Sequence, residues 1–532
     1  MTTERRAAAA VFVFALSLPL ATMWSSAQQV DLDAVYRIKQ EGLQAQRSQA
    51  MEIASYLTDI YGPRLTGSPN INAAADWTMK RMNEWGLTSV HRETWPFGRG
   101  WQNHRFVAHA VAPQAYPLIA YSKAWAPGTN GPVTGEAALA VIQNDADLDA
   151  WRGQLKGKFV LTAPMPVVAA RFEPPGRRFT DPELAELAKQ PLVNVARGRG
   201  GRGGQDVQAQ RAFQRRRLDF FISEGVAALI DPGSGDGGTV FVLAPQGVSY
   251  DPKGPPQPPQ VVMAVEHYGR ILRTLEKQIP VTLQMEIDNR FYDTDLSSFN
   301  LIGELAGTDK ADEVVMLGAH FDSWHTGTGA TDNAAGSAVM LEAMRILKQS
   351  GLTPRRTIRI ALWTGEEQGL LGSREYVRAH FGDPATMQLK PDHARLSAYF
   401  NVDNGTGVIR GVYLQGNEAV APIFERWMEP FRNLGMTTVA IRGTGGTDHQ
   451  SFDAVGLPAF QFIQDPIEYD ARTHHSNMDV WERIQPNDLM RNAIIVAAFA
   501  YEAAMREERL PRKPLPMPPG PGRGAGVAAA AR

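Results

Sequence analysis

Short apolar runs alternate with amphipathic segments in the second half of the chain. From residue 300 onward, runs typical of buried strands are followed by stretches with helical spacing, at 314–317 and 333–348, 358–363 and 370–380, 398–402, and 459–463 and 486–506. This alternation predicts an α/β fold with a mixed, mostly parallel sheet sandwiched by helices. Ligands of such sheets bind beyond the carboxyl ends of the strands, so any chemistry is expected there.

The first half of the chain has a different pattern. Helical spacing covers residues 31–61, and a second amphipathic helix is expected at 73–85. From about Pro117, short apolar runs such as 157–161, 226–230 and 260–264 lie between glycine and proline turns, which predicts an inserted β-rich module. We therefore expect a main domain in two parts, 28–116 and 286–510, with an inserted domain at 117–285.

The two ends of the chain are expected to lie outside the folded domains. Arg5 and Arg6 precede an apolar stretch, and small residues lead to Ala27, which is typical of a signal peptide over 1–27. An uncleaved helix that anchors the protein in the membrane is the alternative. Pro19 and the small residues favour cleavage, so we expect no stable membrane anchor. A periplasmic or secreted protein is expected. The proline, glycine and alanine of 511–532 predict a disordered tail.

Composition narrows the range of functions. The 532 residues are 43% hydrophobic and 21% charged, as in a globular protein, and the net charge of −2 provides no field that would attract nucleic acid. An Arg-Gly run at 197–204 could suggest a nucleic-acid segment, but it is short and lacks aromatics, which favours a solvated loop. Without cysteine, any metal site must use His, Asp and Glu.

Acidic and imidazole side chains follow nearly every predicted strand of the second half. They are His320, Asp322, Glu366, Glu367, Asp403, His474 and His475, and Asp332 opens the helix after the first of these strands. The negative charges of these carboxylates would repel one another unless cations neutralise them. Oxygen and imidazole ligands without sulfur suit zinc, with manganese or cobalt as substitutes.

The spacing indicates a role for each member of this set. One carboxylate bridging two ions activates a water, and we assign that position to Asp332. His320 and Glu367 would complete one ion, and Asp403 and His475 the other. Glu366 would be the general base, and Asp322 would fix the tautomer of His320. No serine-hydrolase elbow, HExxH motif or P-loop is present.

Four motifs together resemble the M28 metallopeptidases. They are GAHFDSW at 318–324, GATDNAAG at 329–336, TGEEQGLLGS at 364–373 and HSNMD at 475–479. The chain is most similar to the carboxypeptidase Q-like branch, whose members are exported and carry a protease-associated domain inserted in the peptidase domain. This resemblance implies a zinc exopeptidase fold, and it covers nearly all of the mature chain.

The resemblance implies two zinc ions per chain. Asp332 would be the bridge and Glu366 the base, and the other ligands would be His320, Glu367, Asp403 and His475. It favours His475 over His474 as the ligand, because the family motif is His-Ser/Thr-x-x-Asp/Glu. Some relatives carry a tyrosine before that histidine, and His474 occupies this position here, so we expect it to stabilise the oxyanion. Asp448 and His449 resemble a family loop beside the substrate pocket.

The expected activity is hydrolysis of terminal peptide bonds by an aminopeptidase or a dipeptidase. A carboxypeptidase is the alternative, which would need a cation for the substrate carboxylate, and Arg442 lies near the expected substrate loop. A glutaminyl cyclase or an inactive binding protein is less favoured, because every ligand and the base are present. Peptides are the expected partners, and association into a homodimer is left open.

Overall fold

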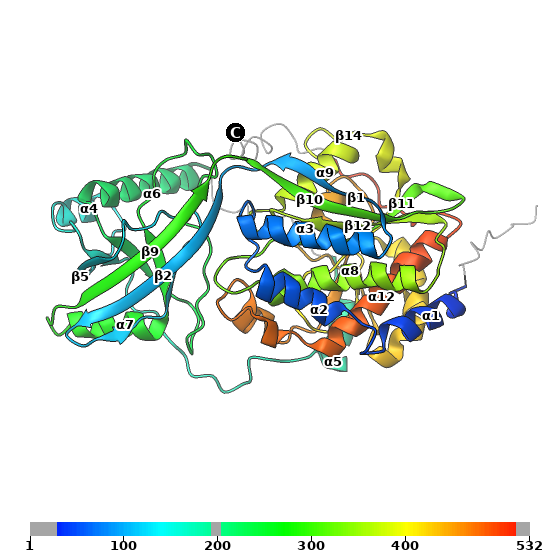
Figure 1. The fold of residues 1–532 in the computed structure, drawn as a ribbon, viewed down its shortest axis with the longest axis horizontal. Helices are drawn as coiled ribbons and strands as arrows, with labels where there is room; N and C mark the ends of the chain where they lie inside the picture. The colour runs from blue at the N-terminus through cyan, green and yellow to red at the C-terminus, as the bar shows by residue number, and fades with distance from the viewer. Residues whose placement is uncertain (1–28, 193–203, 518–532) are drawn as a thin grey trace, which may run out of the picture.

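The computed structural model describes residues 29–192 and 204–517. The expected signal peptide and nearly all of the Arg-Gly run lie outside these residues. The described part forms two lobes, each built around its own sheet of eight strands (Figure 1). In that part of the chain, every helix is too short or too polar to span a bilayer.

The first sheet places four parallel strands at its centre. Its order is β1-β10-β12-β11-β15-β18-β16-β17, and β12, β11, β15 and β18 run parallel to their neighbours within that set. The strands are β1 (Thr88–Pro96), β10 (Ser297–Leu305), β11 (Lys310–His320), β12 (Arg356–Trp363), β15 (Leu396–Asn401), β16 (Ile409–Tyr413), β17 (Thr438–Ala440) and β18 (Ala459–Gln464). The predicted mixed, mostly parallel sheet is thereby confirmed.

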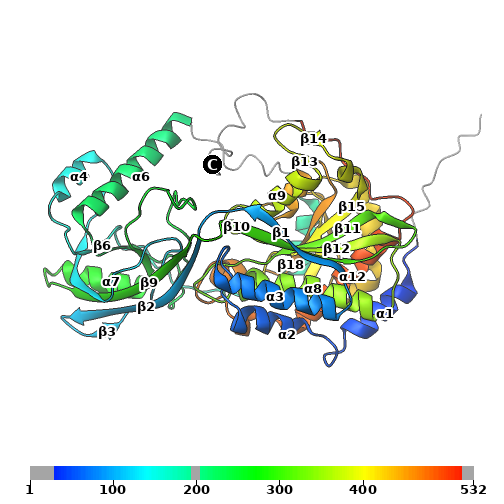
Figure 2. The same ribbon diagram turned by 45° about the horizontal axis from the view of Figure 1, so that its top comes forward.

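Helices cover both faces of this sheet (Figure 2). The larger core lies against α1 (Leu32–Gly42), α2 (Ala50–Ser55), α3 (Pro69–Glu84), α8 (Ala335–Gln349), α10 (Ala421–Met428) and α12 (Pro486–Met505). A smaller core on the other face packs against α9 (Leu371–His380) and α11 (His449–Asp453). Side chains of β11 alternate between the two cores, since Leu317 enters the larger and Met316 the smaller.

The second sheet is formed by one continuous stretch of the chain between β1 and β10. Its order is β3-β2-β9-β5-β6-β7-β8-β4. The strands are β2 (Gly100–Ala112), β3 (Tyr116–Pro117), β4 (Ala120–Ser122), β5 (Val133–Leu139), β6 (Phe159–Leu161), β7 (Ala228–Pro232), β8 (Gln260–Met263) and β9 (Thr282–Tyr292). The helices of this stretch are α4 (Asp145–Trp151), α5 (Asp181–Lys189), α6 (Gly204–Glu224) and α7 (Val265–Leu275).

The second sheet extends beyond the segment 117–285 that the sequence suggested. Strand β2 lies before this segment, and β9 ends after it. The two strands pair along nearly their whole lengths, and Ala108, Ala110, Met285 and Ile287 enter the core of the second lobe. The beginning of the expected tail also contacts the first lobe, because Arg512 donates a hydrogen bond to the carbonyl of His393 at 2.8 Å.

Candidate metal centre

The central strands of the first sheet deliver the expected site residues to one edge. His320 is the last residue of β11, Glu366 and Glu367 follow β12, and Asp403 follows β15. His475 lies further along, after β18 and the π-helical turn η7 (Tyr469–Thr473). Parallel strands end at the same edge, which explains why residues distant in sequence meet there.

The carboxylate of Asp332 lies between two imidazoles. Its Oδ1 is 3.0 Å from Nε2 of His320, and its Oδ2 is 3.3 Å from Nε2 of His475. Nε2 of His320 is also 3.2 Å from Oδ1 of Asp403, and Nε2 of His475 is 2.9 Å from Oε2 of Glu367. Asp332 therefore occupies the central position that the sequence suggested for it.

The other four residues form pairs that differ from the expected ones. His320 is close to Asp403, and His475 is close to Glu367. The expected pairs were His320 with Glu367 and Asp403 with His475. Strands β11 and β15 are neighbours, so His320 and Asp403 leave the sheet side by side. The loop after β18 crosses the strand ends and carries His475 to the residues that follow β12.

The polar atoms at this edge are buried and only partly paired. Oδ2 of Asp332 and Oε1 of Glu367 have no hydrogen-bond partner. Burial opposes ionisation of Asp332, but the hydrogen bond with His320 and the nearby His475 hold the pKa of this carboxyl below its ordinary value. Burial raises the pKa of Glu367 well above its ordinary value, and the charge of Asp332 raises it further. Such crowding of carboxylates is typical of a cation site.

Glu366 lies beside the cluster with its carboxyl in a buried environment. Burial raises its pKa well above the ordinary value, His320 opposes this shift, and the charges of Asp403 and Asp448 add to it. A higher pKa makes a carboxylate more basic, so the environment of Glu366 strengthens it as a proton acceptor. Its position and environment suit a general base.

Asp322 anchors the backbone of the two glutamates. Its Oδ1 accepts from the backbone N–H of Glu366, and its Oδ2 accepts from that of Glu367, each at 3.3 Å. Oδ2 also accepts from the hydroxyl of Thr66 at 2.9 Å. Nδ1 of His320 lies 2.9 Å from the backbone carbonyl of Asp322 and 3.6 Å from its carboxylate. The ring is thus oriented chiefly by the backbone of Asp322.

Three further residues of the expected site lie at its margins. His474 is partly exposed, and its Nε2 is 3.8 Å from Oδ2 of Asp332. Asp448 is fully buried, and burial raises its pKa to about 7. Nε2 of His449 lies 3.1 Å from the carbonyl of Thr444, and burial lowers its pKa to about 4. Of these three, only His474 joins a cluster of potential metal ligands, together with Asp332 and His475.

Comparison with known proteins agrees with this geometry. Residues 300–500, which carry the site, match the family model described as Peptidase family M28. Carboxypeptidase Q of Homo sapiens is 26% identical over 468 residues, covering 88% of this chain and 87% of that protein. The segment 300–500 is thus that of an M28 metallopeptidase, and the chain as a whole is similar to carboxypeptidase Q. Its class of enzyme is a metallo-exopeptidase.

Solved structures show the fold of this peptidase in other organisms. The crystal structure of a Peptidase M28 precursor from Shewanella amazonensis SB2B has a TM-score of 0.63 and 24% identity, covering 92% of this chain and 100% of that one. A zinc aminopeptidase from Bacillus subtilis has a TM-score of 0.55 and 19% identity, covering 87% and 96%. Both similarities extend across most of the described chain, in agreement with the zinc exopeptidase fold.

Sequence reasoning missed a buried arginine of the peptidase. Arg64 is fully buried, and its guanidinium donates to the carbonyls of Leu57, Phe321, Thr328 and Gly329. These bonds join the loops that follow His320 and precede Asp332. Burial lowers the pKa of Arg64 to about 10, and Asp479 and Asp322 oppose this shift. A single arginine in a turn between helices has no periodic signal, so its role follows only from tertiary contacts.

Tyr469 and Asp479 were also missed as parts of the site. The ring of Tyr469 stacks on His474 with centroids 4.7 Å apart. Burial raises the pKa of Tyr469 well above its ordinary value, and the charges of Asp332 and Asp403 raise it further. Asp479 accepts from the backbone N–H groups of Thr331 and Asp332 at 2.6 and 3.2 Å, which fixes the backbone of Asp332. Asp479 was visible in the HSNMD motif, but its contact with Asp332 was not.

Proposed function

We propose that this M28 peptidase is a zinc-dependent aminopeptidase or dipeptidase with two ions per chain. The observation that carries the proposal is the position of Asp332 between two imidazole and carboxylate pairs, His320 with Asp403 and His475 with Glu367. One oxygen of Asp332 faces each pair. A bridging carboxylate with one such pair on each side is the ligand set of a co-catalytic centre.

The residues present fit zinc. His320, Asp332 and Asp403 form one cluster of potential ligands, and Asp332, His474 and His475 form another. The unpaired oxygens of Asp332 and Glu367 point to a cation, because buried carboxylate oxygens rarely lack partners. When bound, zinc ions polarise a carbonyl and lower the pKa of water. Manganese and cobalt remain chemically compatible substitutes.

Glu366 would move the proton in this reaction. Its buried carboxylate would accept a proton from the attacking water and donate it to the leaving amine nitrogen of the substrate. Asp322 would hold the backbone of Glu366, and thereby the direction of the carboxylate, through the N–H bond at 3.3 Å. Asp322 thus acts through Glu366 rather than on the substrate.

The charge balance of the site favours substrates with a free amine. Besides the guanidinium groups of Arg64 and Arg374, whose charges interact with its carboxylates, the site contains seven carboxyl groups, and two divalent ions would neutralise four of them. They belong to Asp322, Asp332, Glu366, Glu367, Asp403, Asp448 and Asp479. The remaining negative charge would attract the α-ammonium group of a peptide. Arg442 donates instead to Gln190 and to the carbonyl of Gly443, so it is not left unpaired for a substrate carboxylate.

The proposal is tested by metal analysis and a peptide panel. Mass spectrometry of the purified protein should find two zinc ions, and chelation should abolish release of amino acids from dipeptides and free-amine peptides. Cleavage of N-blocked peptides from the other end would show a carboxypeptidase instead. If the protein holds one zinc ion or none and cleaves no peptide, the glutaminyl cyclase or the inactive binding protein would be favoured.

Export is the second part of the proposal, and it rests on the N-terminal sequence pattern alone. The basic residues, apolar stretch and small residues before Gln28 support a signal peptide. N-terminal sequencing of the protein from a periplasmic or culture fraction should begin at Gln28. A mature chain that begins at Met1 or Thr2 would contradict this part.

A further inference from the structure

The loop that carries His475 contacts two segments of the second lobe. We define the His475 loop as residues 465–479, between β18 and the turn before α12. The strap is the stretch 163–180, which leaves β6 in the second lobe and leads to α5 against the first lobe (Figure 1). The strap contacts the beginning of the loop, and residues 240–242 contact its end.

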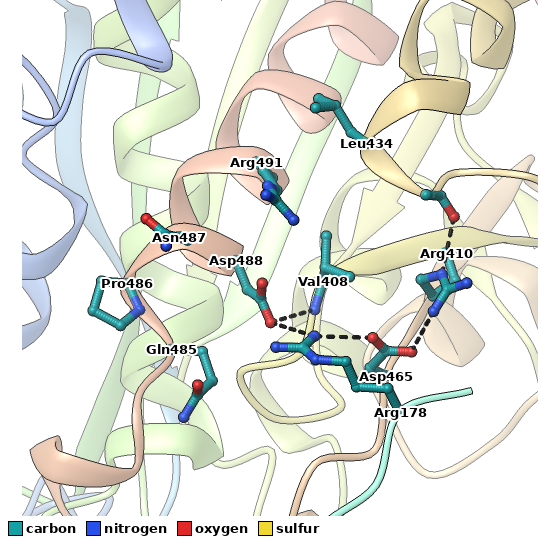
Figure 3. Close-up of a pocket in the computed structure, with 11 residues that line it drawn as sticks. Arg178, Val408, Arg410, Leu434, Asp465, Gln485, Pro486, Asn487, Asp488 and Arg491 are labelled. Atoms are coloured by element: carbon teal, nitrogen blue, oxygen red, sulfur yellow. Dashed lines mark hydrogen bonds and ion pairs between the residues drawn. The ribbon is translucent and has the colours of Figure 1, made fainter. Parts of the chain in front are cut away.

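The strap is fixed to the loop by backbone pairing and by an ion-pair network. Arg177 and Ile467 exchange backbone hydrogen bonds of 3.0 and 2.9 Å. Next to them, Nη1 of Arg178 donates to Asp465 at 2.9 Å and to Asp488 at 2.7 Å (Figure 3). The backbone N–H of Phe179 donates to the second oxygen of Asp465 at 3.0 Å.

The environment of Arg178 makes these contacts strong. Both carboxylates are buried, with side-chain exposures of 0% for Asp465 and 4% for Asp488. Partial burial opposes the charge of Arg178, but the hydrogen bonds that it donates to the two carboxylates raise its pKa above the ordinary value. Without Arg178, Asp465 would keep its ion pair with Arg410 at 3.0 Å, but the buried Asp488 would lose its ion-pair partner, which is destabilising locally.

The end of the loop is fixed separately. The backbone N–H of Val242 donates to the carbonyl of His475 at 3.0 Å, and Phe241 forms a β-bridge with Ser476. The side-chain oxygen of Asn477 accepts from the N–H of Val240 at 2.7 Å. Residues 240–242 lie between β7 and β8, so this contact also comes from the second lobe.

The backbone of His475 requires such support. Its φ of 63° lies in the left-handed region, which a non-glycine residue adopts at a cost. Strained conformations of this kind persist where the surrounding structure fixes them from several sides. The strap contacts the loop at residues that precede His475, and residues 240–242 contact it at His475 and the residues that follow.

We propose that the second lobe positions His475 in the metal centre, with Arg178 and Asn477 as the positioning residues. The proposal rests on the zinc centre of the proposed function. Arg178 acts through Asp465, the first residue of the loop, and Asn477 acts through residues 240–242, which bond the backbone at His475. The inserted stretch of chain is then part of the metal-binding apparatus, although it contributes no ligand.

The test compares Arg178→Met with the matched control Arg177→Met in the full-length protein. The side chain of Arg177 forms an ion pair of 2.6 Å with Glu183 in α5 and lies over the ring of Phe179, so its loss spares the contacts between the strap and the His475 loop. Two readouts are needed: hydrogen exchange of peptides covering 465–479, and the zinc affinity of each of the two ions by chelator competition. Neither readout requires a peptide substrate.

We expect Arg178→Met to exchange faster in the His475 loop and to bind one of the two ions roughly 10- to 100-fold more weakly, as when groups that orient ligands are removed. Arg178→Lys should recover part of the loss, and Arg177→Met should behave like the wild type. If Arg178→Met does not fold, Asn477→Ala decides the question with the same two readouts.

Wild-type exchange and zinc affinity in a folded Arg178→Met variant, or in Asn477→Ala where the first does not fold, would overturn the proposal. A wild type that binds two zinc ions but cleaves no peptide would instead contradict the proposed function and leave this inference standing. A wild type that binds no zinc would remove the centre on which both rest.

Discussion

Nε2 of His475 lies 2.9 Å from Oε2 of Glu367, although the strands that precede these residues, β18 and β12, are separated by two other strands of the sheet. The contact exists because the His475 loop returns across the strand ends. His320 needs no such loop, since it and Asp403 follow adjacent strands. The two halves of the centre therefore depend on different parts of the fold.

Replacing Glu366 by Gln should abolish most turnover while the metal remains bound. Gln cannot accept the proton, and loss of a general base reduces kcat by roughly 100-fold or more. Steady-state kinetics on a dipeptide, with zinc content measured in parallel, checks this. Glu375→Gln on the surface of α9 is the control, and turnover of Glu366→Gln within a few-fold of wild type would refute the assigned role.

Single ligand variants should reveal which residues share an ion. Because His320 lies near Asp403 and His475 near Glu367, His475→Ala and Glu367→Ala should lose the same zinc ion. The double variant should then still hold one ion, whereas Asp332→Ala should lose both. Zinc counting by mass spectrometry after dialysis measures this. A double variant without zinc would favour the pairing of His320 with Glu367.

Arg64→Met should destabilise the peptidase strongly. The substitution leaves four carbonyl groups without their donor in a buried region, and an unsatisfied buried polar group costs about 1–3 kcal/mol. We expect the free energy of unfolding to fall by about 3 kcal/mol or more, measured by urea denaturation. Arg395→Met removes an exposed pair with Asp392 and should change it by less than about 0.5 kcal/mol. Equal effects would contradict this account.

Glu502→Gln should stabilise the protein at neutral and alkaline pH but not at pH 4.5. Glu502 is buried, accepts from the backbone N–H of Asp31 at 3.0 Å, and has its pKa raised by burial to about 7. A raised carboxyl pKa means that ionisation opposes folding, so the penalty is absent below about pH 4.5 and complete above about pH 7. The expected gain at pH 8 is on the order of 2–3 kcal/mol.

Thermal and urea unfolding at pH 4.5 and pH 8 measure this dependence on pH. Glu482→Gln, at an exposed position, is the control and should show no such dependence. A gain of the same size for Glu502→Gln at both pH values would show that packing, and not ionisation, is responsible.

The sequence was informative where local pattern and chemistry coincide. Apolar runs followed by acidic or imidazole residues predicted the four central strands, and the structure brings His320, Asp332, Asp403 and His475 to one edge. The order of residues after each strand is enough for this, because parallel strands end together. The pairing of ligands was not predictable in this way, since it depends on the path of the His475 loop.

The remaining features depend on contacts between distant segments. Arg64 binds carbonyls about 260 residues away, and Arg178 binds Asp465 and Asp488, which are 287 and 310 residues away. The neighbouring residues in the sequence do not distinguish either arginine from one on a solvated surface. The long pairing of β2 with β9 was missed for a similar reason, because the two strands lie far apart in the sequence.

Strand β1 pairs with β10 across an interval of about two hundred residues, and that interval contains the whole second sheet. During synthesis, the edge of the first sheet must wait until the second lobe has emerged from the ribosome, and pairings of such long range form slowly. A chain that acquires its final shape late stays unfolded for longer, which would suit the export proposed above.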